Sequence, residues 1–190
     1  MSIIWLSFII LFGFATSICT AKYSGGDGSE STPYRISDAN DMNDIGLHQE
    51  DWGSHFVMVN DINLAQFTGT QFNIIGTDYE NPFTGVFDGN GFTISNFTFE
   101  SNDVNYIGLF VWVDDPNAEI KNLTLINPNI NVGKSRYIGS LVSCLIYGTI
   151  CDCSVQGGTI SSGGGYSFGI GVVGGLVGAS EGFISNCYAM

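Results

Sequence analysis

The stretch LHQEDWGSH holds the side chains of this sequence that are best suited to metal binding or acid–base chemistry. His48 and His55 flank Trp52, and Glu50 and Asp51 stand between the two histidines. Imidazole and carboxylate groups are common metal ligands and proton carriers. The H-x6-H spacing fits no specific metal motif, and the stretch follows a predicted helix directly. We therefore expect Trp52 to cover the end of a core, and we predict no metal or catalytic residue here.

Two glycine-containing stretches resemble nucleotide-binding loops. GIGVVG at 169–174 has the G-x-G-x-x-G spacing, but that fingerprint needs a helix opening at its third glycine. The residues that follow, GLVGASEG, are too rich in glycine to form a helix. VGKS at 132–135 lacks the first glycine of a phosphate-binding loop, because Pro128 occupies that position. We expect no nucleotide cofactor.

The number and placement of charged residues argue against nucleic-acid binding and against polysaccharide cleavage. Eighteen acidic residues oppose five basic ones, for a formal net charge of −13, so the surface should repel nucleic acid. A polysaccharide-cleaving enzyme would need a basic residue beside clustered carboxylates. The basic residues after position 21 are Lys22, Arg35, Lys121, Lys134 and Arg136. The sequence pattern places none of them beside a cluster of carboxylates, and we expect Lys121 to point outward. We predict no catalytic residue.

Acidic residues in predicted loops raise the question of a surface metal ion. Asp78, Glu80, Asp114 and Asp115 lie in such loops but lack the ligand spacing of an EF-hand. Solvated charge is the preferred interpretation, and a surface calcium ion is the alternative. We expect no cofactor.

The first 21 residues indicate export. The apolar run IIWLSFIILFGFA is too short for a comfortable membrane span and is followed by small residues, as in a secretory signal peptide. We expect cleavage after Ala21 and an extracellular or cell-surface location. Acylation at Cys19 and an uncleaved anchor are the alternatives.

Four cysteines remain after the signal peptide: Cys144, Cys151, Cys153 and Cys187. An even number in an exported chain permits two disulfides. All four lie in apolar, strand-like stretches, where a thiol commonly serves as a small buried hydrophobe. We expect Cys153 and Cys187 to form a thiol stack, with a disulfide between them as the alternative; Cys144 and Cys151 are a second candidate pair.

One helix is predicted, shortly before the repeats. Ser37 can cap it, acidic residues favour its first turn, and Ala39, Met42 and Ile45 fall on one face. Gly46 is expected to end it.

Internal repetition is the strongest pattern in the sequence. Four segments, 85–99, 108–125, 140–155 and 175–189, each contain an isoleucine, an Asn or Asp two residues later, and apolar residues three and five later. The isoleucines recur at intervals of 26, 30 and 34 residues. Short strands at such intervals, without helices, are typical of a β-solenoid with one coil per repeat.

Aligning the four segments predicts a structural ladder with two kinds of column. The inward apolar column contains Ile94, Ile120, Ile150 and Ile184. A corner column contains Asn96, Asn122, Asp152 and Asn186, residue types that tolerate the left-handed backbone region. Asn96 and Asn122 also satisfy the N-glycosylation pattern, but at such corners we expect them to be structural.

FTGVFDGNGFTISNF, together with GGLVG followed by ISNCY, resembles the GLUG-motif repeat family of bacterial secreted and surface proteins. That motif also occurs in the non-catalytic region of IgA-specific metallopeptidases. The resemblance covers roughly residues 23–190. It implies an all-β fold, a right-handed parallel β-helix (β-solenoid) with a short N-terminal capping helix.

These observations predict a signal peptide at 1–21, an N-terminal loop and cap helix at 22–54, and β-helix repeats at 55–190. The expected function is a non-catalytic, exported module for surface display, adhesion or the spacing of a partner domain, with a glycan or protein ligand. A carbohydrate-active enzyme and an accessory module of a longer secreted peptidase are the alternatives. Because the last repeat has no polar cap, we expect either edge-to-edge self-association or further C-terminal repeats.

Overall fold

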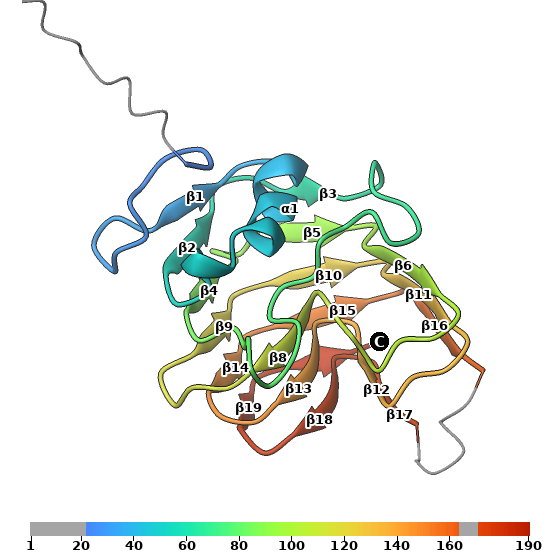
Figure 1. Ribbon diagram of the computed structural model, residues 1–190. Coiled ribbons are helices and arrows are strands. Elements are labelled where there is room, and N and C mark those ends of the chain that lie inside the picture. The colour runs from blue at the N-terminus through green and yellow to red at the C-terminus, as the bar shows by residue number, and fades with distance from the viewer. Residues whose placement is uncertain (1–21, 164–170) are drawn as a thin grey trace, which may run out of the picture.

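The computed structural model describes residues 22–163 and 171–190, and the chain in these ranges winds into a parallel β-solenoid of about four turns (Figure 1). The largest sheet runs along the whole stack and is formed by β1 (Tyr34–Ile36), β2 (His55–Met58), β4 (Val86–Asp88), β9 (Glu119–Lys121), β14 (Thr149–Cys151) and β19 (Phe183–Ser185). A second sheet follows it after a sharp corner and contains β3 (Ile62–Asn63), β5 (Thr93–Ser95), β10 (Thr124–Ile126), β15 (Ser154–Gln156) and β20 (Tyr188–Ala189).

The remaining strands complete each coil. They are β6 (Thr98–Ser101), β11 (Asn129–Val132) and β16 (Thr159–Ser162) in one sheet, β7 (Tyr106–Ile107), β12 (Tyr137–Gly139) and β17 (Val172–Gly174) in the next, and β8 (Phe110–Val113), β13 (Val142–Leu145) and β18 (Val177–Ser180) in the last. Each strand pairs in parallel with the equivalent strand of the neighbouring coil. Apolar side chains from all the sheets point inward and form one continuous core.

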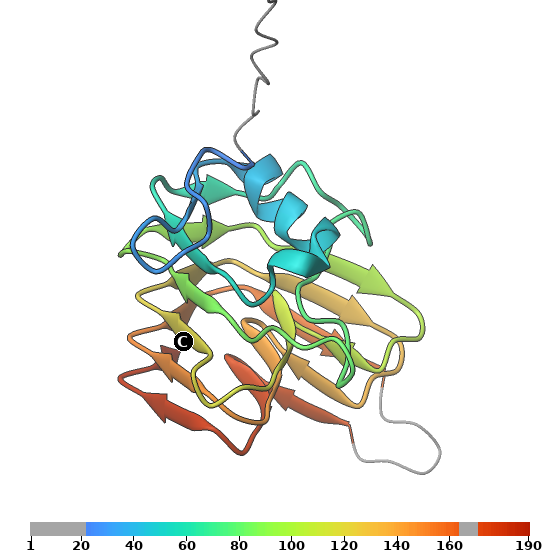
Figure 2. The ribbon, with the colours of Figure 1, turned by 60° about the vertical axis from the view of Figure 1, so that its left-hand side comes forward.

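Helix α1 (Ala39–Leu47) and the 3₁₀ turn η1 (Gln49–Asp51) lie across the N-terminal end of the stack, as Figure 2 shows. Ala39, Met42 and Ile45 are buried against the first coil, on the face that the sequence predicts. The buried Trp52 donates its indole N–H to the carbonyl of Ile45 at 2.7 Å, which fixes the end of the helix on the core. The cap helix predicted from the sequence is therefore present.

Both ends of α1 differ from the sequence prediction. Asp38, not Ser37, is the N-cap, because its carboxylate accepts the backbone N–H groups of Asn40 and Asp41 at 2.8 and 3.0 Å. Gly46 lies within the helix instead of ending it. A Cβ at Gly46 would lie 2.1 Å from the carbonyl oxygen of Asn73, so glycine is needed here for close contact with a neighbouring loop.

The predicted apolar column is correct in three of its four positions. Ile120, Ile150 and Ile184 pair with one another in successive coils, but their partner in the preceding coil is Phe87 and not Ile94. Ile94 pairs with Leu125 in the second sheet. Four residues, 89–92, connect β4 to β5, whereas two residues make this connection in the later coils, and this difference displaces the alignment.

The predicted asparagine column combines two different corners of the coil. Asn122, Asp152 and Asn186 follow the strands of the first sheet, whereas Asn96 lies at the next corner, in the position that Asn127 occupies one coil later. All five have φ between 51° and 57°, in the left-handed region. The two corners share one local pattern, an Asn or Asp followed by an apolar residue, which explains why they are confused in the sequence.

The side-chain amides at the glycosylation patterns are engaged within the protein. Asn96 donates to the side-chain oxygen of Asn63 at 3.0 Å, and Asn122 donates to the carboxylate of Asp88 at 3.0 Å. Both asparagines are half-buried. Their amides bridge neighbouring coils.

Candidate functional site

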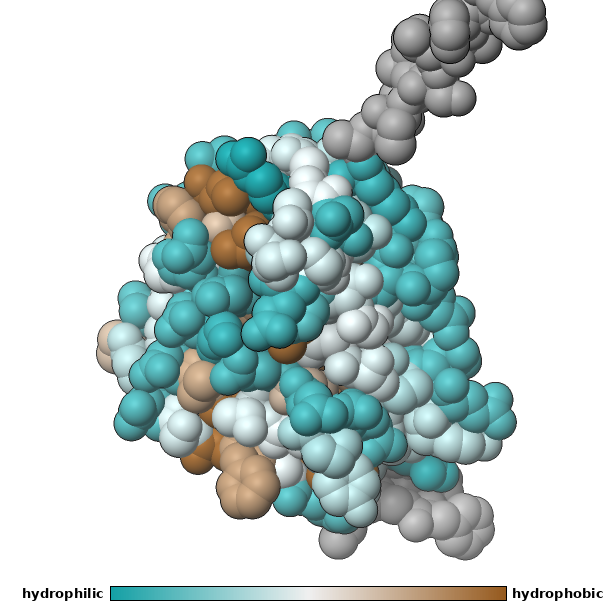
Figure 3. All heavy atoms as spheres, turned by 90° about the vertical axis from the view of Figure 1, so that its left-hand side faces the viewer, coloured by the Kyte–Doolittle hydropathy of each residue, from teal (hydrophilic) through white to brown (hydrophobic). Residues whose placement is uncertain are grey.

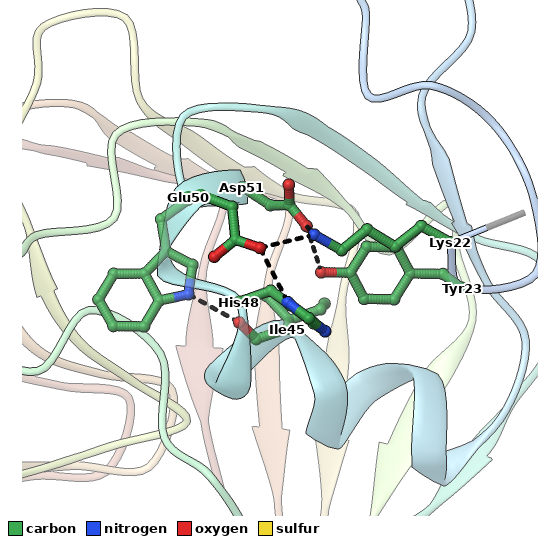
Figure 4. A network of polar contacts seen from close by, with 7 residues as sticks. Lys22, Tyr23, Ile45, His48, Glu50 and Asp51 are labelled. Carbon is green, nitrogen blue, oxygen red and sulfur yellow. Dashed lines mark hydrogen bonds and ion pairs between the residues drawn. The ribbon is translucent and has the colours of Figure 1, made fainter.

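The group of polar residues nearest to metal-site geometry lies at the N-terminal end, beside α1 (Figure 4). Ligand atoms of His48, Glu50 and Asp51 all lie within 4.8 Å of one another. The ammonium group of Lys22 stands among them, 2.9 Å from the Glu50 carboxylate and 2.6 Å from that of Asp51. Tyr23 adds a hydroxyl donor to Asp51 at 2.8 Å.

Lys22 supplies the positive charge that two neighbouring carboxylates require. Its hydrogen bond lowers the pKa of Glu50 to about 2, with smaller contributions from the backbone N–H of Glu50 and from His48. Burial raises the pKa of Tyr23, and so does its hydrogen bond to Asp51, so Tyr23 stays a neutral donor. A metal ion would have to displace Lys22 from this network. The arrangement therefore fits a structural link between the N-terminal loop and the cap.

The Glu50 contact should make the stability of the cap depend on pH. Because the folded-state pKa of Glu50 is depressed to about 2, its contribution is complete above about pH 4.5 and is lost as the pH falls towards 2. We expect Glu50→Gln to lower the melting temperature at pH 6 and to have little effect near pH 2, measured by circular dichroism. Glu80→Gln, at an exposed loop position, is the matched control. An unchanged difference in melting temperature across this range would contradict the assignment.

His55 is separated from this cluster and faces a charged groove on the outside of the largest sheet. The groove has a volume of about 300 Å³ and is lined on its polar side by Glu30, His55, Asp88, Glu119 and Lys121. This outcome corrects the expectation that no basic residue stands beside carboxylates. The parallel register places Lys121 next to Asp88 of the preceding coil, and Lys121 is hydrogen-bonded to Glu119.

The chemistry of this groove is that of ionic binding. The hydrogen bond from Lys121 to Glu119 raises the pKa of the lysine. A lysine acting as a general base needs a lowered pKa to be deprotonated near neutral pH. Lys121 is therefore an ammonium ion in this groove, suited to hold an anionic group or a neighbouring carboxylate but not to abstract a proton. The outward alternation Glu119-x-Lys121 was visible in the sequence, but its position beside Asp88 depends on the correct alignment of Phe87.

The other basic residues lie elsewhere on the solenoid. Arg35 is on β1, two strands before Asp88 in the same outward row. Lys134 and Arg136 lie between β11 and β12, on a different side of the coil from Lys121. The structure thus brings two of the five basic residues, Lys22 and Lys121, together with carboxylates and leaves the other three apart from that groove.

Neither glycine-containing stretch forms a phosphate-binding loop in the described residues. Val172–Gly174, the described end of the GIGVVG stretch, is strand β17 and not the start of a helix; residues 169 and 170 lie outside the described ranges. Gly133 follows β11, and Ser135 is buried with its hydroxyl donated to the carbonyl of Asn105.

Cys153 and Cys187 occupy equivalent positions in successive coils, and both are free thiols, as are Cys144 and Cys151. Each of the stacked pair donates its S–H to the carbonyl two residues earlier, at 3.2 Å for Cys153 and 3.1 Å for Cys187. The backbone N–H of Cys153 also points at the Cys187 sulfur, at 3.4 Å. The two thiols thus repeat one local geometry along the core.

Thiol accessibility gives a direct check on this core. Burial raises the pKa of Cys144 to about 11 and that of Cys153 to about 12, which removes the reactive thiolate at ordinary pH. We expect iodoacetamide at pH 8 to leave both unmodified in the folded protein while it labels the partly exposed Cys187. Peptide mass spectrometry before and after unfolding measures this. A disulfide between Cys153 and Cys187 in non-reducing digests would contradict the expectation.

The predicted signal peptide at 1–21 lies outside the described residues. Among the residues that are described, no helix is long and apolar enough to cross a membrane.

Sequence comparisons relate the chain to segments of longer proteins. No family model matches it. It is 35% identical, over 72% of its length, to a protein of Evansella cellulosilytica named as a Gly-rich membrane protein, of which it covers 16%. It is 31% identical, over 82% of its length, to halomucin of Haloquadratum walsbyi, of which it covers 2%. The chain therefore spans less than a fifth of the curated relatives that it matches.

One solved structure shares the fold. A crystal structure from Bacteroides ovatus, named as an immunoglobulin A1 protease, superposes with a TM-score of 0.60 at 19% identity. The match covers 88% of this chain and 59% of the other. At this identity the likeness shows the β-solenoid architecture.

Proposed function

We propose that this chain is a non-catalytic, exported β-solenoid module of the GLUG type, which presents its lateral surface to a ligand at the cell surface. The observation that carries the proposal is the size of the matches: the sequence corresponds to 16% and 2% of two much longer proteins, one named as a membrane protein and one as halomucin. A segment of this size with its own continuous core behaves as a module. The motif resemblance and the shared solenoid architecture support the same assignment.

The lateral surface offers a polar groove that suits adhesion to a glycan. It has a volume of about 510 Å³ and follows the ends of β6, β11 and β16 across three coils. Glu100, Asn131 and Ser161 form one row along it, paired in register. Carboxylate, amide and hydroxyl groups at a regular spacing can hydrogen-bond successive hydroxyls of an extended polysaccharide.

A glycan array probed with the purified chain tests this role. We expect saturable binding to an extended polysaccharide, weakened by Asn131→Ala and unaffected by Asn60→Ala, which removes an exposed asparagine near the N-terminal end. The bound polysaccharide should keep its chain length. Shortening of any polysaccharide by the pure protein would overturn the non-catalytic assignment.

The charged groove on the largest sheet favours a second candidate, a carbohydrate-active enzyme. Asp88 and Glu119 place two carboxylates around one opening beside Lys121, and a pair of carboxylates is the usual catalytic set of glycoside hydrolases. Cleavage of an acidic polysaccharide that is lost on Lys121→Met would establish this candidate. Loss on changing Lys134 or Arg136 instead would place the activity on the other side of the coil.

The solved structure favours a third candidate, an accessory module of a longer secreted peptidase, because the matching chain is named as a protease. A metalloprotease H-E-x-x-H motif in the same reading frame would support it.

A further inference from the structure

Two outward rows of polar side chains cross β6, β11 and β16, and the first row is hydrogen-bonded within the protein. Thr98, Asn129 and Thr159 pair in register along it. Thr159 donates its hydroxyl to the side-chain oxygen of Asn129 at 2.8 Å, and Thr98 donates to the carbonyl of Phe67 at 2.9 Å. A ligand could engage these groups only by breaking contacts that hold the coils together.

The second row has no such partners. It contains Glu100, Asn131 and Ser161, which are exposed and line the polar groove of about 510 Å³. Across the described residues, no hydrogen bond or ion pair engages these three side chains. Their polar atoms can therefore bind a ligand without the loss of any bond inside the protein.

Polarity alone does not distinguish this groove from the rest of the surface. Figure 3 shows hydrophilic side chains over much of the face at the left of Figure 1, where strands of the largest sheet lie. On that sheet, however, the charged groups are already engaged. Lys121 is paired with Glu119, and Asp88 accepts the side-chain amide of Asn122 at 3.0 Å.

The second row is held in place from both sides. β11 pairs with β6 and with β16, and the backbone N–H of Glu100 is donated to the carbonyl of Gly69 in the preceding coil at 3.0 Å. Paired strands lie about 4.8 Å apart, so the backbone positions of the row span about 10 Å. This spacing is close to the length of one sugar unit in an extended chain, so a polysaccharide along the solenoid axis can contact one residue of the row with each unit.

The charge of the groove separates classes of polysaccharide. Of the described residues that line it, Glu100 alone is charged. Lys134 and Arg136 lie in the turn after β11, and neither lines the groove. A carboxylate in this position repels uronic acid and sulfate groups, but it accepts a charge-assisted hydrogen bond from an ammonium group.

We propose that this groove binds a polysaccharide whose sugar units carry free amino groups. The chain lies along the solenoid axis, with one ammonium group at Glu100 and sugar hydroxyls at Asn131 and Ser161, whose amide and hydroxyl both donate and accept hydrogen bonds. The inference rests on the glycan binding proposed above and names the class of glycan. Because the contact at Glu100 is ionic, the preference for the amine should depend on salt.

Isothermal titration calorimetry tests the proposal with three probes of equal length: glucosamine oligomers, N-acetylglucosamine oligomers and oligogalacturonate. At a mildly acidic pH, where the amine is protonated, we expect the glucosamine oligomers to bind about fivefold more tightly than the acetylated ones, as for an exposed ion pair. Oligogalacturonate should bind most weakly. The preference for the amine should vanish in about 1 M salt, where the screening length falls to about 3 Å.

Glu100→Gln should remove the preference for the amine and leave the affinity for the acetylated oligomers unchanged, because the amide keeps the size and the hydrogen-bonding capacity of the side chain. Glu80→Gln, which removes an equal charge from an exposed loop outside the groove, is the matched control and should keep the preference. Circular dichroism confirms that both variants are folded.

The outcomes separate this inference from the proposed function. Equal binding of the amino and acetylated oligomers, or loss of the preference in Glu80→Gln as well, would overturn the role of Glu100 while glycan binding stands. Tighter binding of oligogalacturonate that is lost on Lys134→Gln would show that the surface selects acidic glycans instead. Binding of none of the three probes, with binding of another polysaccharide on the array, would overturn the inference alone, whereas binding of no glycan at all would overturn both.

Discussion

Replacing Phe87 with alanine is expected to lower the free energy of unfolding by about 3–5 kcal/mol, a large share of the stability of a domain of this size. Phe87 is fully buried in the first sheet. Its ring packs against Phe56, with centroids 6.4 Å apart, and against Phe110, with centroids 5.4 Å apart. Removing it opens a cavity between coils that their hydrogen-bonded spacing prevents from closing.

Ile184→Ala is the control, because it lies in the same column at the open end. Ile184 is already partly solvated, so its truncation removes less buried surface and should cost less than half as much as Phe87→Ala. Urea unfolding followed by circular dichroism measures both variants. Equal losses would show that burial along the column does not control stability.

The second large effect is expected at Gly139, in the bend between β12 and β13. An added Cβ would lie 2.0 Å from the carbonyl oxygen of Val142 and 2.6 Å from the backbone nitrogen of Gly178. Both atoms belong to the backbone, so no rotamer change relieves the clash. Gly139→Ala should therefore cost about 3 kcal/mol or more in unfolding free energy.

Gly69→Ala separates this clash from backbone strain. Gly69 has φ of +63°, but an added Cβ there meets no atom within 4 Å. Its replacement should cost about 1 kcal/mol, the penalty of a left-handed conformation alone. Similar unfolding free energies for the two variants would rule out the steric explanation of Gly139.

The same bend explains the first glycine of the GGLVG element. Gly174 pairs with Gly139 of the preceding coil, and a Cβ at Gly174 would lie 1.8 Å from the carbonyl oxygen of Val177. In both coils the carbonyl three residues later folds back over the glycine. The glycine in this short motif is thus needed for a tight backbone bend.

Much of the architecture could be predicted from the sequence because each coil repeats one pattern of inward residues. The sequence predicts the column through Ile120, Ile150 and Ile184 because β9, β14 and β19 reach the same corner with equal loop lengths. The same pattern places Ile94 in the wrong column because two extra residues follow β4 and because both corners use an asparagine. Local patterns do not distinguish two corners of equal geometry.

The charged sites were harder to predict, because they depend on contacts between coils. Lys121 lies beside Asp88, which is 33 residues earlier in the chain. A sequence alignment of the coils places these two residues together only if it pairs Phe87 with Ile120. Lys22 meets Asp51 through a loop that has no counterpart in the repeats. Neither contact can be predicted from the spacing of the two residues along the chain.

The parallel stacking of the coils has a mechanical consequence. From Ile120 to Ile150 the chain uses 30 residues, yet the solenoid advances by only about 4.8 Å, the distance between neighbouring strands. The same 30 residues, fully extended, would reach about 100 Å. A chain folded in this way forms a wide, stiff solenoid instead of a long one. Among the roles open to such a module, broad lateral presentation thus suits its shape better than reach.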